Sequence, residues 1–423
     1  MAGYIERVVD SELDELLEEL PAVALEGPRA VGKTETALRR AQTVFHLDKD
    51  AALAIARSDP QRLAQGEQPI LIDEWQRLPA SWDVVRRAVD ADFAGSCFLL
   101  TGSAAPNELP THSGAGRIVT LRMRPLSLAE RLGNGTVSLS QLLNGARGPL
   151  EGTSDVTLVD YANEIVRSGL PAARGLRDRA IRGMLDGYLN RIIEYDIVEQ
   201  GTRVRDPQSL RTWLSAYAAA VSTATTFTKI TQAASTREGQ TPARSTALAY
   251  RGALERALMI EPTPAWLPTP NRLRRVATAP VHQLADPAFA ARLLGVDVDA
   301  LLEGSPGRGI LPRDGTLLGG LFESLVTLSV RVYAQANEAR VFHMRTRAGE
   351  HEVDLILERP DGRIVALEVK LGGTVDDDDV RHLHWLAQRI GPQLLDAAVL
   401  TTGSEAYRRQ DGIAVIPAAL LTA

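Results

Sequence analysis

The chain has 423 residues, with 47 basic and 53 acidic side chains and a net charge of −6 at pH 7. This acidic balance excludes a histone-like protein that binds nucleic acid through bulk positive charge, and the one cysteine, Cys97, excludes an internal disulfide or a cysteine-based zinc cage. The first ten residues form no apolar leader and no run of eighteen apolar residues follows, so we expect a cytoplasmic protein that has no contact with a membrane.

Short apolar runs alternate with helical patterns in the first third of the chain. We expect helices at Lys33–Arg40 and Trp82–Val89. The expected strands are Ala22–Glu26, Val44–Leu47, Ile70–Asp73, Cys97–Thr101 and Ile118–Leu121. Such alternation is typical of a parallel sheet covered by helices, so the sequence predicts an α/β fold for this region.

A glycine-rich loop stands between the first expected strand and the first expected helix. Its eight residues match the pattern G-x-x-x-x-G-K-[ST] and are Gly27, Pro28, Arg29, Ala30, Val31, Gly32, Lys33 and Thr34. In such a loop the glycines let backbone N–H groups wrap phosphate oxygens, the lysine reaches the β- and γ-phosphates, and the hydroxyl is a ligand of Mg²⁺. Because a strand precedes the loop and a helix follows it, the sequence predicts an ATP site.

Two further strand ends carry polar side chains that suit this site. Asp73 and Glu74 follow an apolar strand, and we expect Asp73 to hold Mg²⁺ through water and Glu74 to deprotonate the attacking water. Ser103 follows the strand that contains Thr101, where a hydroxyl either contacts the nucleotide or only caps the turn. Because ligands bind at the carboxyl ends of parallel strands, we expect both strand ends beside the loop.

These motifs resemble those of AAA-type P-loop ATPases. Further stretches are similar to one prokaryotic family, the AAA-type ATPases with a carboxy-terminal domain of unknown function; these are Gly114–Arg117, Arg124–Glu130, Ser168–Pro171 and Tyr188–Ile197. The resemblance covers nearly the whole chain and implies ATP hydrolysis. It also suggests that Arg117 stabilises transition-state charge, within its own chain or across a subunit interface. The alternative for Arg117 is an ordinary surface arginine.

The middle of the chain is mainly helical and locally basic. Between residues 229 and 275, eight basic side chains stand against three acidic ones. Two helices and a strand expected there look like a winged helix, which the family usually has in this place; they are Phe227–Ala234, Ala243–Ala257 and Leu258–Ile260. Arg244 and Arg251 on the second helix would then face DNA phosphates or bases. A helical packing module whose arginines face solvent is the alternative.

The last part of the chain carries a second group of acidic residues and a lysine. Asp354 lies in an alternating strand, Glu368 and Lys370 lie in the next one, and Glu323 lies in an apolar helical run before them. This arrangement resembles the PD-(D/E)XK nuclease core. Glu368 and Lys370 are two residues apart and so share one face of a strand. Glu323, Asp354 and Glu368 would hold Mg²⁺, and Lys370 would position the attacking water. A salt-bridged pair of exposed strand residues is the alternative.

The sequence therefore predicts three parts: an AAA-type ATPase domain over residues 1–135, a helical region with a winged-helix-like segment at about 226–266 over residues 136–275, and an α/β nuclease-like domain over residues 276–423. One hypothesis is an Mg²⁺-dependent ATPase that acts on DNA. The other is a nucleotide-dependent switch in transcription, defence or a toxin–antitoxin system, whose last domain binds without cutting. ATP or ADP, DNA and further copies of the chain are the expected partners.

Overall fold

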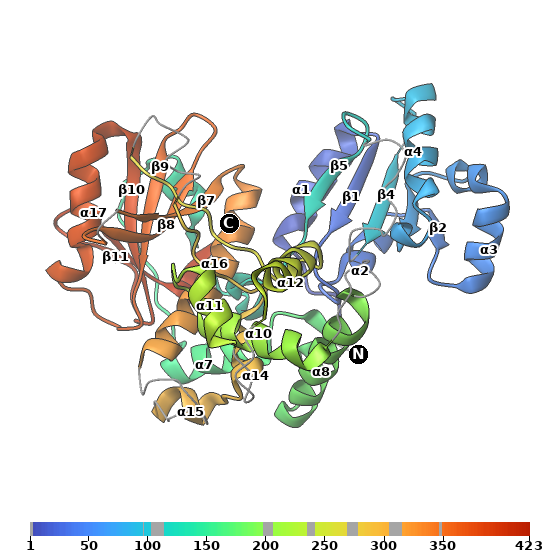
Figure 1. The fold of residues 1–423 in the computed structure, drawn as a ribbon. Coiled ribbons are helices and arrows are strands. Elements are labelled where there is room, and N and C mark those ends of the chain that lie inside the picture. Colours follow the sequence, from blue (N-terminus) through green and yellow to red (C-terminus); the bar gives the residue numbers. More distant parts are fainter. Residues whose placement is uncertain are drawn as a thin grey trace.

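Two large β-sheets lie on the two sides of the molecule, and helices from the middle of the chain lie between and below them (Figure 1). The computed structural model describes residues 3–95, 97–102, 114–197, 206–234, 242–268, 278–303, 315–346 and 349–423. Six residues named or counted above lie outside these ranges: Ser103, Arg237, Glu238, Arg272, Arg274 and Arg275.

The first sheet is parallel throughout and has the strand order β2-β3-β4-β1-β5. Its strands are β1 (Ala22–Glu26), β2 (Thr43–His46), β3 (Ile70–Asp73), β4 (Phe98–Gly102) and β5 (Val119–Arg122). Each of the five expected strands is found within one residue of its expected bounds. The predicted parallel α/β sheet is therefore confirmed.

Helices cover both faces of this sheet, which explains why its strands are continuous apolar runs. The side chains of Val23 and Leu25 join one hydrophobic core, and those of Ala22 and Ala24 join another, because alternate residues of a strand point to opposite faces. The helices of this region are α1 (Val8–Glu19), α2 (Lys33–Leu38), α3 (Asp50–Ser58) and α4 (Ala80–Ala91), with single 3₁₀ turns at Pro60–Ala64 and Trp75–Arg77.

A group of helices follows the first sheet. They are α5 (Leu128–Leu132), α6 (Leu139–Leu143), α7 (Leu158–Arg167), α8 (Asp178–Arg191), α10 (Pro207–Ala219), α11 (Phe227–Ala233), α12 (Arg244–Arg256), α14 (Pro287–Leu294) and α15 (Val298–Glu303), with a 3₁₀ turn at Pro171–Ala173 and a π-helical turn, η4, at Ile192–Asp196. Helices α10 and α14 each begin with an aspartate N-cap followed by proline, a pair that satisfies a free N–H group and presets the first helical residue.

The strand expected at Leu258–Ile260 is wrong in extent. Leu258 has a φ of +59°, which is incompatible with an extended strand, and Ile260 makes only an isolated bridge with Leu284. Thr263 makes a second isolated bridge with Val281. The two helices before this segment agree with their predicted ranges within one residue.

The second sheet has the order β11-β12-β10-β9-β8-β7 and is mixed. Its strands are β7 (Arg340–Arg345), β8 (Glu352–Glu358), β9 (Ile364–Val369), β10 (Leu394–Thr401), β11 (Tyr407–Arg408) and β12 (Ala414–Pro417). The long helix α16 (Gly315–Ala336) precedes it, and α17 (Asp377–Ile390) connects β9 to β10, with 3₁₀ turns at Gly391–Gln393 and Ala418–Leu420. The core order is thus helix, three strands, helix and strand.

The parts of the chain interleave rather than follow one another. Strand β6 (Val137–Ser138), in the stretch expected to belong to the helical region, pairs in parallel with β13 (Leu421–Thr422) at the chain end. The Arg147 Nε donates to the Leu395 carbonyl in β10 at 2.8 Å. Conversely, α14, which was expected in the last domain, packs against α7 and α10 of the helical region.

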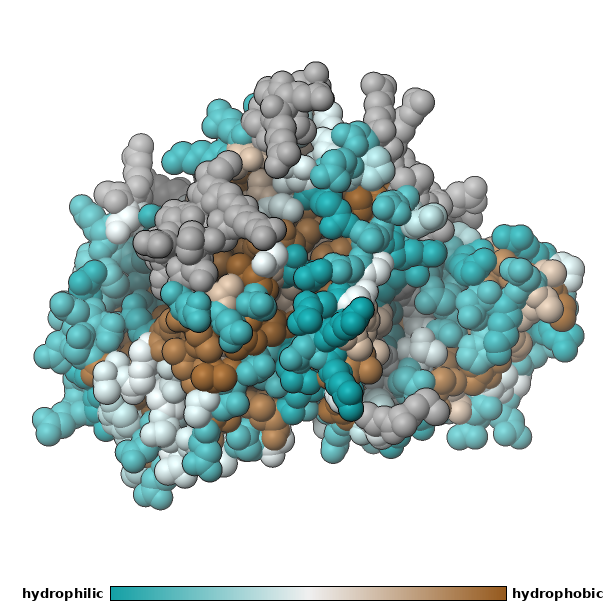
Figure 2. All heavy atoms as spheres, turned by 90° about the horizontal axis from the view of Figure 1, so that it is seen from below, coloured by the Kyte–Doolittle hydropathy of each residue, from teal (hydrophilic) through white to brown (hydrophobic). Residues whose placement is uncertain are grey.

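Among the residues that the structure describes, one helix is long and apolar enough to span a membrane, the segment Leu317–Ala336 of α16, but 78% of its apolar window is buried inside the protein. Helix α16 packs against α1, α7 and α14 as well as strand β7. Helices α7, α14 and α15 lie at the lower end of the molecule (Figure 1), and the view of that end shows a group of hydrophobic side chains within a largely hydrophilic surface (Figure 2).

Candidate functional site

The glycine-rich loop connects β1 to α2 in a conformation that depends on its small residues. Gly32 has a φ of +103° and Ala30 a φ of +62°, so the backbone turns twice through the left-handed region. A Cβ atom on Gly27 would lie 2.1 Å from the Met123 carbonyl oxygen. The neighbouring strand end therefore approaches the loop so closely that only glycine fits there.

Lys33 is the first residue of α2 and is 6% exposed. Its Nζ donates hydrogen bonds to the carbonyl oxygens of Gly27 at 2.9 Å and Pro28 at 2.8 Å, both in the loop. Burial lowers the pKa of Lys33 to about 8, although the nearby Glu74 carboxylate favours the charged form. The ammonium group is thus held inside the loop by backbone oxygens.

Asp73, at the end of β3, is the centre of the polar contacts. Its Oδ1 accepts hydrogen bonds from the hydroxyl groups of Thr34 at 2.8 Å and Thr101 at 2.6 Å, and its Oδ2 lies 3.2 Å from His46 Nδ1. Strand register explains the meeting, because His46, Asp73 and Thr101 are direct neighbours across β2, β3 and β4. The expected gathering of strand ends beside the loop is observed for these residues.

His46 and Asp48 were not among the residues predicted from the sequence. With Asp73, they form the one group of three or more His, Cys, Asp or Glu side chains in the described residues whose ligand atoms all lie within 4.8 Å of one another. The sequence signal that could have found this group was His46, a polar residue at the end of strand β2. The hydroxyl of Thr34 and the carboxylate of Asp73 are oxygen donors of the type that Mg²⁺ prefers, so this donor set fits the ion.

Glu74 follows Asp73 in a left-handed conformation, with a φ of +57°. This backbone conformation is uncommon for a residue other than glycine. The Gln76 Nε2 donates to its Oε2 at 2.5 Å. A Cβ on Gly102 would come within 2.7 Å of Gln76 Oε1, so the end of β4 confines the glutamine that holds Glu74.

The structure places Arg117 away from the glycine-rich loop of its own chain. Val119 in β5 pairs with Val23 near the amino end of β1, and Arg117 lies two residues before it, whereas Gly27 follows the carboxyl end of β1. The Arg117 Nε is paired with Asp90 of α4 at 2.8 Å, and the side chain is 47% exposed. Within one chain, Arg117 therefore lies near the amino-terminal ends of the parallel strands, whereas the loop lies at the carboxyl end of β1.

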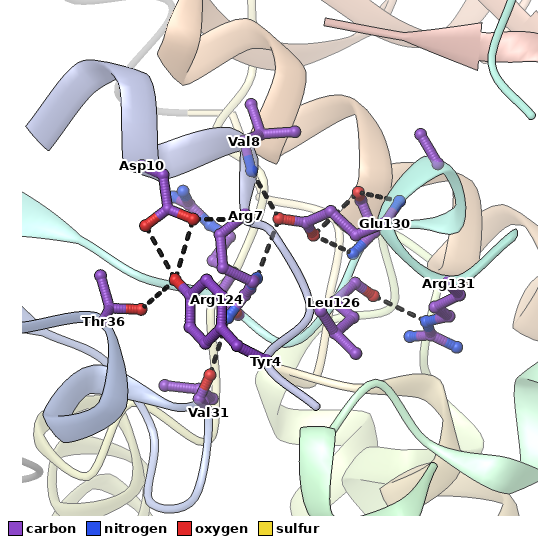
Figure 3. Close-up of polar contacts among 12 residues, drawn as sticks. Tyr4, Arg7, Val8, Asp10, Val31, Thr36, Arg124, Leu126, Glu130 and Arg131 are labelled. Atoms are coloured by element: carbon purple, nitrogen blue, oxygen red, sulfur yellow. Dashed lines mark hydrogen bonds and ion pairs between the residues drawn. The ribbon is translucent and has the colours of Figure 1, made fainter. Parts of the chain in front are cut away.

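Arg7, in the segment before α1, joins the loop to the residues that follow β5 through hydrogen bonds (Figure 3). Arg7 donates from Nη1 to the Val31 carbonyl at 2.8 Å, from Nη2 to the Arg124 carbonyl at 2.7 Å and from Nε to Glu130 at 2.9 Å. The Arg7 side chain is 3% exposed. A buried guanidinium thus connects the glycine-rich loop to the segment that follows β5.

That segment in turn meets the other two parts of the chain at Glu261. Arg124 donates to the Glu261 carboxylate at 2.6 Å, and Arg331 of α16 lies 3.5 Å from it. Burial alone would raise the pKa of Glu261, but the positive charges of Arg124 and Arg331 outweigh it and hold that pKa well below its ordinary value. The Arg124 Nη1 also donates to Gln335 of α16 at 2.7 Å. We call this group the Glu261 junction.

In the segment that the sequence predicts to be a winged helix, Arg244 is exposed at the start of α12. Arg251, one of the predicted DNA-facing residues, pairs with Glu255 one turn away at 2.7 Å and lies over the ring of Phe227 in α11. The two predicted arginines therefore differ in their surroundings. Arg251 contacts Glu255 and Phe227 of the same segment, whereas Arg244 is exposed to solvent.

The second group of predicted residues meets at β8, β9 and α16. The Lys370 Nζ donates to Glu368 Oε1 at 3.0 Å, and the Val369 N–H donates to Asp354 Oδ2 at 2.8 Å. Glu368 is 4% exposed, and its Oε2 is buried with no hydrogen-bond partner in the described part of the chain. Asp354 and Glu368 oppose one another across the antiparallel strands, since Leu355 pairs with Leu367.

Each carboxyl group of this cluster is harder to ionise because it is buried and its neighbours carry negative charge. Burial, and then the charge of Asp354, raises the pKa of Glu368 and of Glu323. Burial likewise raises the pKa of Asp354. Buried carboxylates with raised pKa values and one unpartnered oxygen have the chemistry of a divalent cation site, so the donor set fits Mg²⁺. Their ligand atoms are more widely spaced than those around Asp73.

Comparison with known proteins gives a family match for three stretches of the chain. Residues 19–132 match the model of an AAA domain, residues 158–300 match a domain of unknown function (DUF8612), and residues 318–421 match another domain of unknown function (DUF4143). Two uncharacterized proteins, from Mycobacterium bovis and Mycobacterium tuberculosis, are each 26% identical over 419 residues, which is 96% of this chain and 82% of theirs. The chain thus carries an AAA-type ATPase domain and a carboxy-terminal DUF4143 domain, as the resemblance implied.

Proposed function

We propose that this protein hydrolyses ATP with Mg²⁺ at the glycine-rich loop. The observation that carries the proposal is the meeting of three elements: Lys33 inside the loop, and the hydroxyl groups of Thr34 and Thr101 on the Asp73 carboxylate. Backbone N–H groups of the loop and the start of α2 bind phosphate oxygens. Bound Mg²⁺ supplies neutralising charge on the β- and γ-phosphates, with Thr34 and Asp73 as the residues that hold it.

Within this proposal the side chains have separate tasks. Lys33 gives up its two carbonyl contacts and donates to phosphate oxygens, where its charged form is favoured. Glu74 accepts the proton of the attacking water, and Gln76 orients the Glu74 carboxylate through their hydrogen bond. His46 fixes the Asp73 carboxylate from the edge of the sheet.

Lys33→Ala tests the site directly, with Lys49→Ala as its control because Lys49 is exposed at the start of α3. We expect Lys33→Ala to lose ATP binding or hydrolysis, measured by phosphate release and by binding of a labelled nucleotide, and Lys49→Ala to behave as wild type. Unchanged hydrolysis in Lys33→Ala contradicts the assignment.

We further propose that the carboxy-terminal domain is related to the PD-(D/E)XK nucleases and acts on DNA. The supporting observations are the order helix, three strands, helix and strand, and the contact of Lys370 with Glu368 beside Asp354. Lys370 would place a water molecule against a phosphodiester. The exposed Arg244 of α12 would contact the DNA backbone in a winged-helix arrangement.

The alternative is a nucleotide-dependent switch whose last domain binds DNA without cutting it. Incubation with single- and double-stranded DNA, Mg²⁺ or Mn²⁺ and ATP separates the two. Cleavage that is lost in Glu368→Ala favours the nuclease, and DNA-stimulated ATP hydrolysis without cleavage favours the switch. DNA that changes neither reaction contradicts both.

A further inference from the structure

The phosphate loop carries an arginine whose partner lies far along the chain. Arg29 is the second residue after Gly27, and its Nε lies 2.7 Å from the Oδ2 of Asp196, at the end of the turn η4. The Arg29 side chain is 37% exposed, whereas that of Asp196 is 5% exposed. The Tyr188 hydroxyl of α8 donates to the Arg29 carbonyl at 3.3 Å. Helix α8 and η4 therefore hold both the backbone and the side chain of this residue.

Two other arginines near the loop, Arg7 and Arg124, have structural partners that occupy them, and Arg122 at the end of β5 lies 3.9 Å from Glu261. All three guanidinium nitrogens of Arg7 donate to buried acceptors, and Arg124 is bound to Glu261. Arg117 lies near the amino-terminal ends of the parallel strands. In the described residues, Arg29 combines a position inside the loop, a partly exposed side chain and Asp196 as its ionic partner.

Hydrolysis at this site would be accelerated by a further positively charged side chain besides Lys33 and the bound Mg²⁺. The water oxygen forms a bond to the γ-phosphorus, the bond from that phosphorus to the β–γ bridging oxygen breaks, and the water proton passes to Glu74, which leaves ADP and inorganic phosphate. Negative charge spreads over the γ-phosphoryl oxygens during this step, and a guanidinium with its planar fork of N–H donors is suited to stabilise it.

We propose that Arg29 is this catalytic arginine, supplied by the same chain, and that Asp196 is the positioning residue that holds it. The proposal rests on the proposed ATPase function and names the cation of that site. When Arg29 turns to the phosphate, Asp196 keeps a second partner, since Arg191 Nε lies 3.4 Å from its Oδ1. The buried carboxylate is therefore not left without a countercharge, and the exchange costs less than the breaking of an isolated buried pair.

The arrangement also ties catalysis to the helical region. Asp196 and Arg191 belong to α8 and η4, and Tyr188 of α8 stacks on Phe289 of α14. A shift of α8 would move Asp196 relative to the loop and change how freely Arg29 reaches the nucleotide. Asp196→Asn keeps the shape of the side chain but removes its charge, which weakens its interaction with Arg29.

The test compares Arg29→Ala, Arg29→Lys and Asp196→Asn with Arg87→Ala, an exposed arginine on α4 that serves as the control. We expect Arg29→Ala to lower kcat at least 100-fold while the Kd for ATP changes less than tenfold, since removal of such an arginine costs about 10³–10⁵ in kcat in related chemistry. Binding of ADP with aluminium fluoride, which mimics the planar γ-phosphoryl group, should weaken at least 100-fold in the same variant.

Arg29→Lys should recover only part of kcat, because an ammonium lacks the fork of donors. Asp196→Asn should change kcat and leave the Kd for ATP within a few-fold of wild type. A kcat of Arg29→Ala within threefold of Arg87→Ala contradicts the inference, and so does an equal loss of binding for ATP and for ADP with aluminium fluoride. An absence of hydrolysis in the wild-type protein would instead contradict the proposed function itself.

Discussion

We expect Glu261→Gln to weaken the contact between the three parts of the chain. Glu261 receives Arg124 from the segment after β5 and Arg331 from α16. The substitution keeps the shape of the side chain and removes its charge. Both guanidinium groups then lose their counter-ion, and Arg331 is buried, with 7% of its surface exposed.

The magnitude follows from burial and from the contacts that remain. Removal of one partner from a buried ion pair costs about 3–5 kcal/mol. The Glu261 side chain is 24% exposed and Arg124 keeps its bond to Gln335, so we expect a loss of about 2–3 kcal/mol in the free energy of unfolding. Glu255→Gln is the matched control, because Glu255 pairs with Arg251 at the surface of α12; it should cost less than about 0.5 kcal/mol.

Urea unfolding followed by tryptophan fluorescence measures the difference, with the buried Trp266 close to the junction in sequence. A carboxyl group whose pKa is depressed in the folded state stabilises the protein above its ordinary pKa of 4.5, and that contribution is lost as the pH falls further. The difference in the free energy of unfolding between wild type and Glu261→Gln should therefore be largest at pH 7 and should decrease below about pH 4.5. Equal unfolding free energies for Glu261→Gln and Glu255→Gln at pH 7 would show that the buried charge of Glu261 does not stabilise the fold.

Three further predictions concern the two sites. Because the pKa of Lys33 is about 8 in the free protein and phosphate binding requires its charged form, the Kd for ATP should rise about tenfold per pH unit above pH 8, measured by titration calorimetry, and a flat profile contradicts this. Glu368→Gln should stabilise the protein by about 1–3 kcal/mol. The reason is that the folded state raises the pKa of Glu368, so the stability gained by the variant over wild type grows as the pH rises above 4.5. Thermal unfolding measures this gain, and an equal gain at pH 5 and pH 8 would contradict the prediction. Gly27→Ala should weaken ATP binding more than tenfold because its Cβ would meet Met123, while Gly148→Ala, with open space around it, should not; equal affinities would show that the close approach is unimportant.

The phosphate loop and the first sheet could be predicted from the sequence because their signals are local. Each strand is a short apolar run bounded by polar residues, and the motif from Gly27 to Thr34 fits into eight consecutive positions. Strand β7 was not predicted, because its sequence, Arg340–Arg345, has charged ends and lies at the edge of the second sheet.

The contacts that join distant parts could not be predicted. Arg124 and Glu261 are 137 residues apart, and no pattern of spacing relates them. The position of Arg117 depends on strand register, since its distance from the loop is set by the pairing of β5 with β1. The same holds for Asp196, which meets Arg29 only through the packing of α8 beside the loop.

In the proposed function, Glu74 accepts the proton of the water that attacks ATP. The most direct measurement is ATP binding and single-turnover hydrolysis by Glu74→Gln beside the wild-type protein. The Kd for ATP should stay within a few-fold of wild type while hydrolysis falls about 10²–10⁴-fold, the usual contribution of a positioned base. Hydrolysis by Glu74→Gln at the wild-type rate would contradict the account.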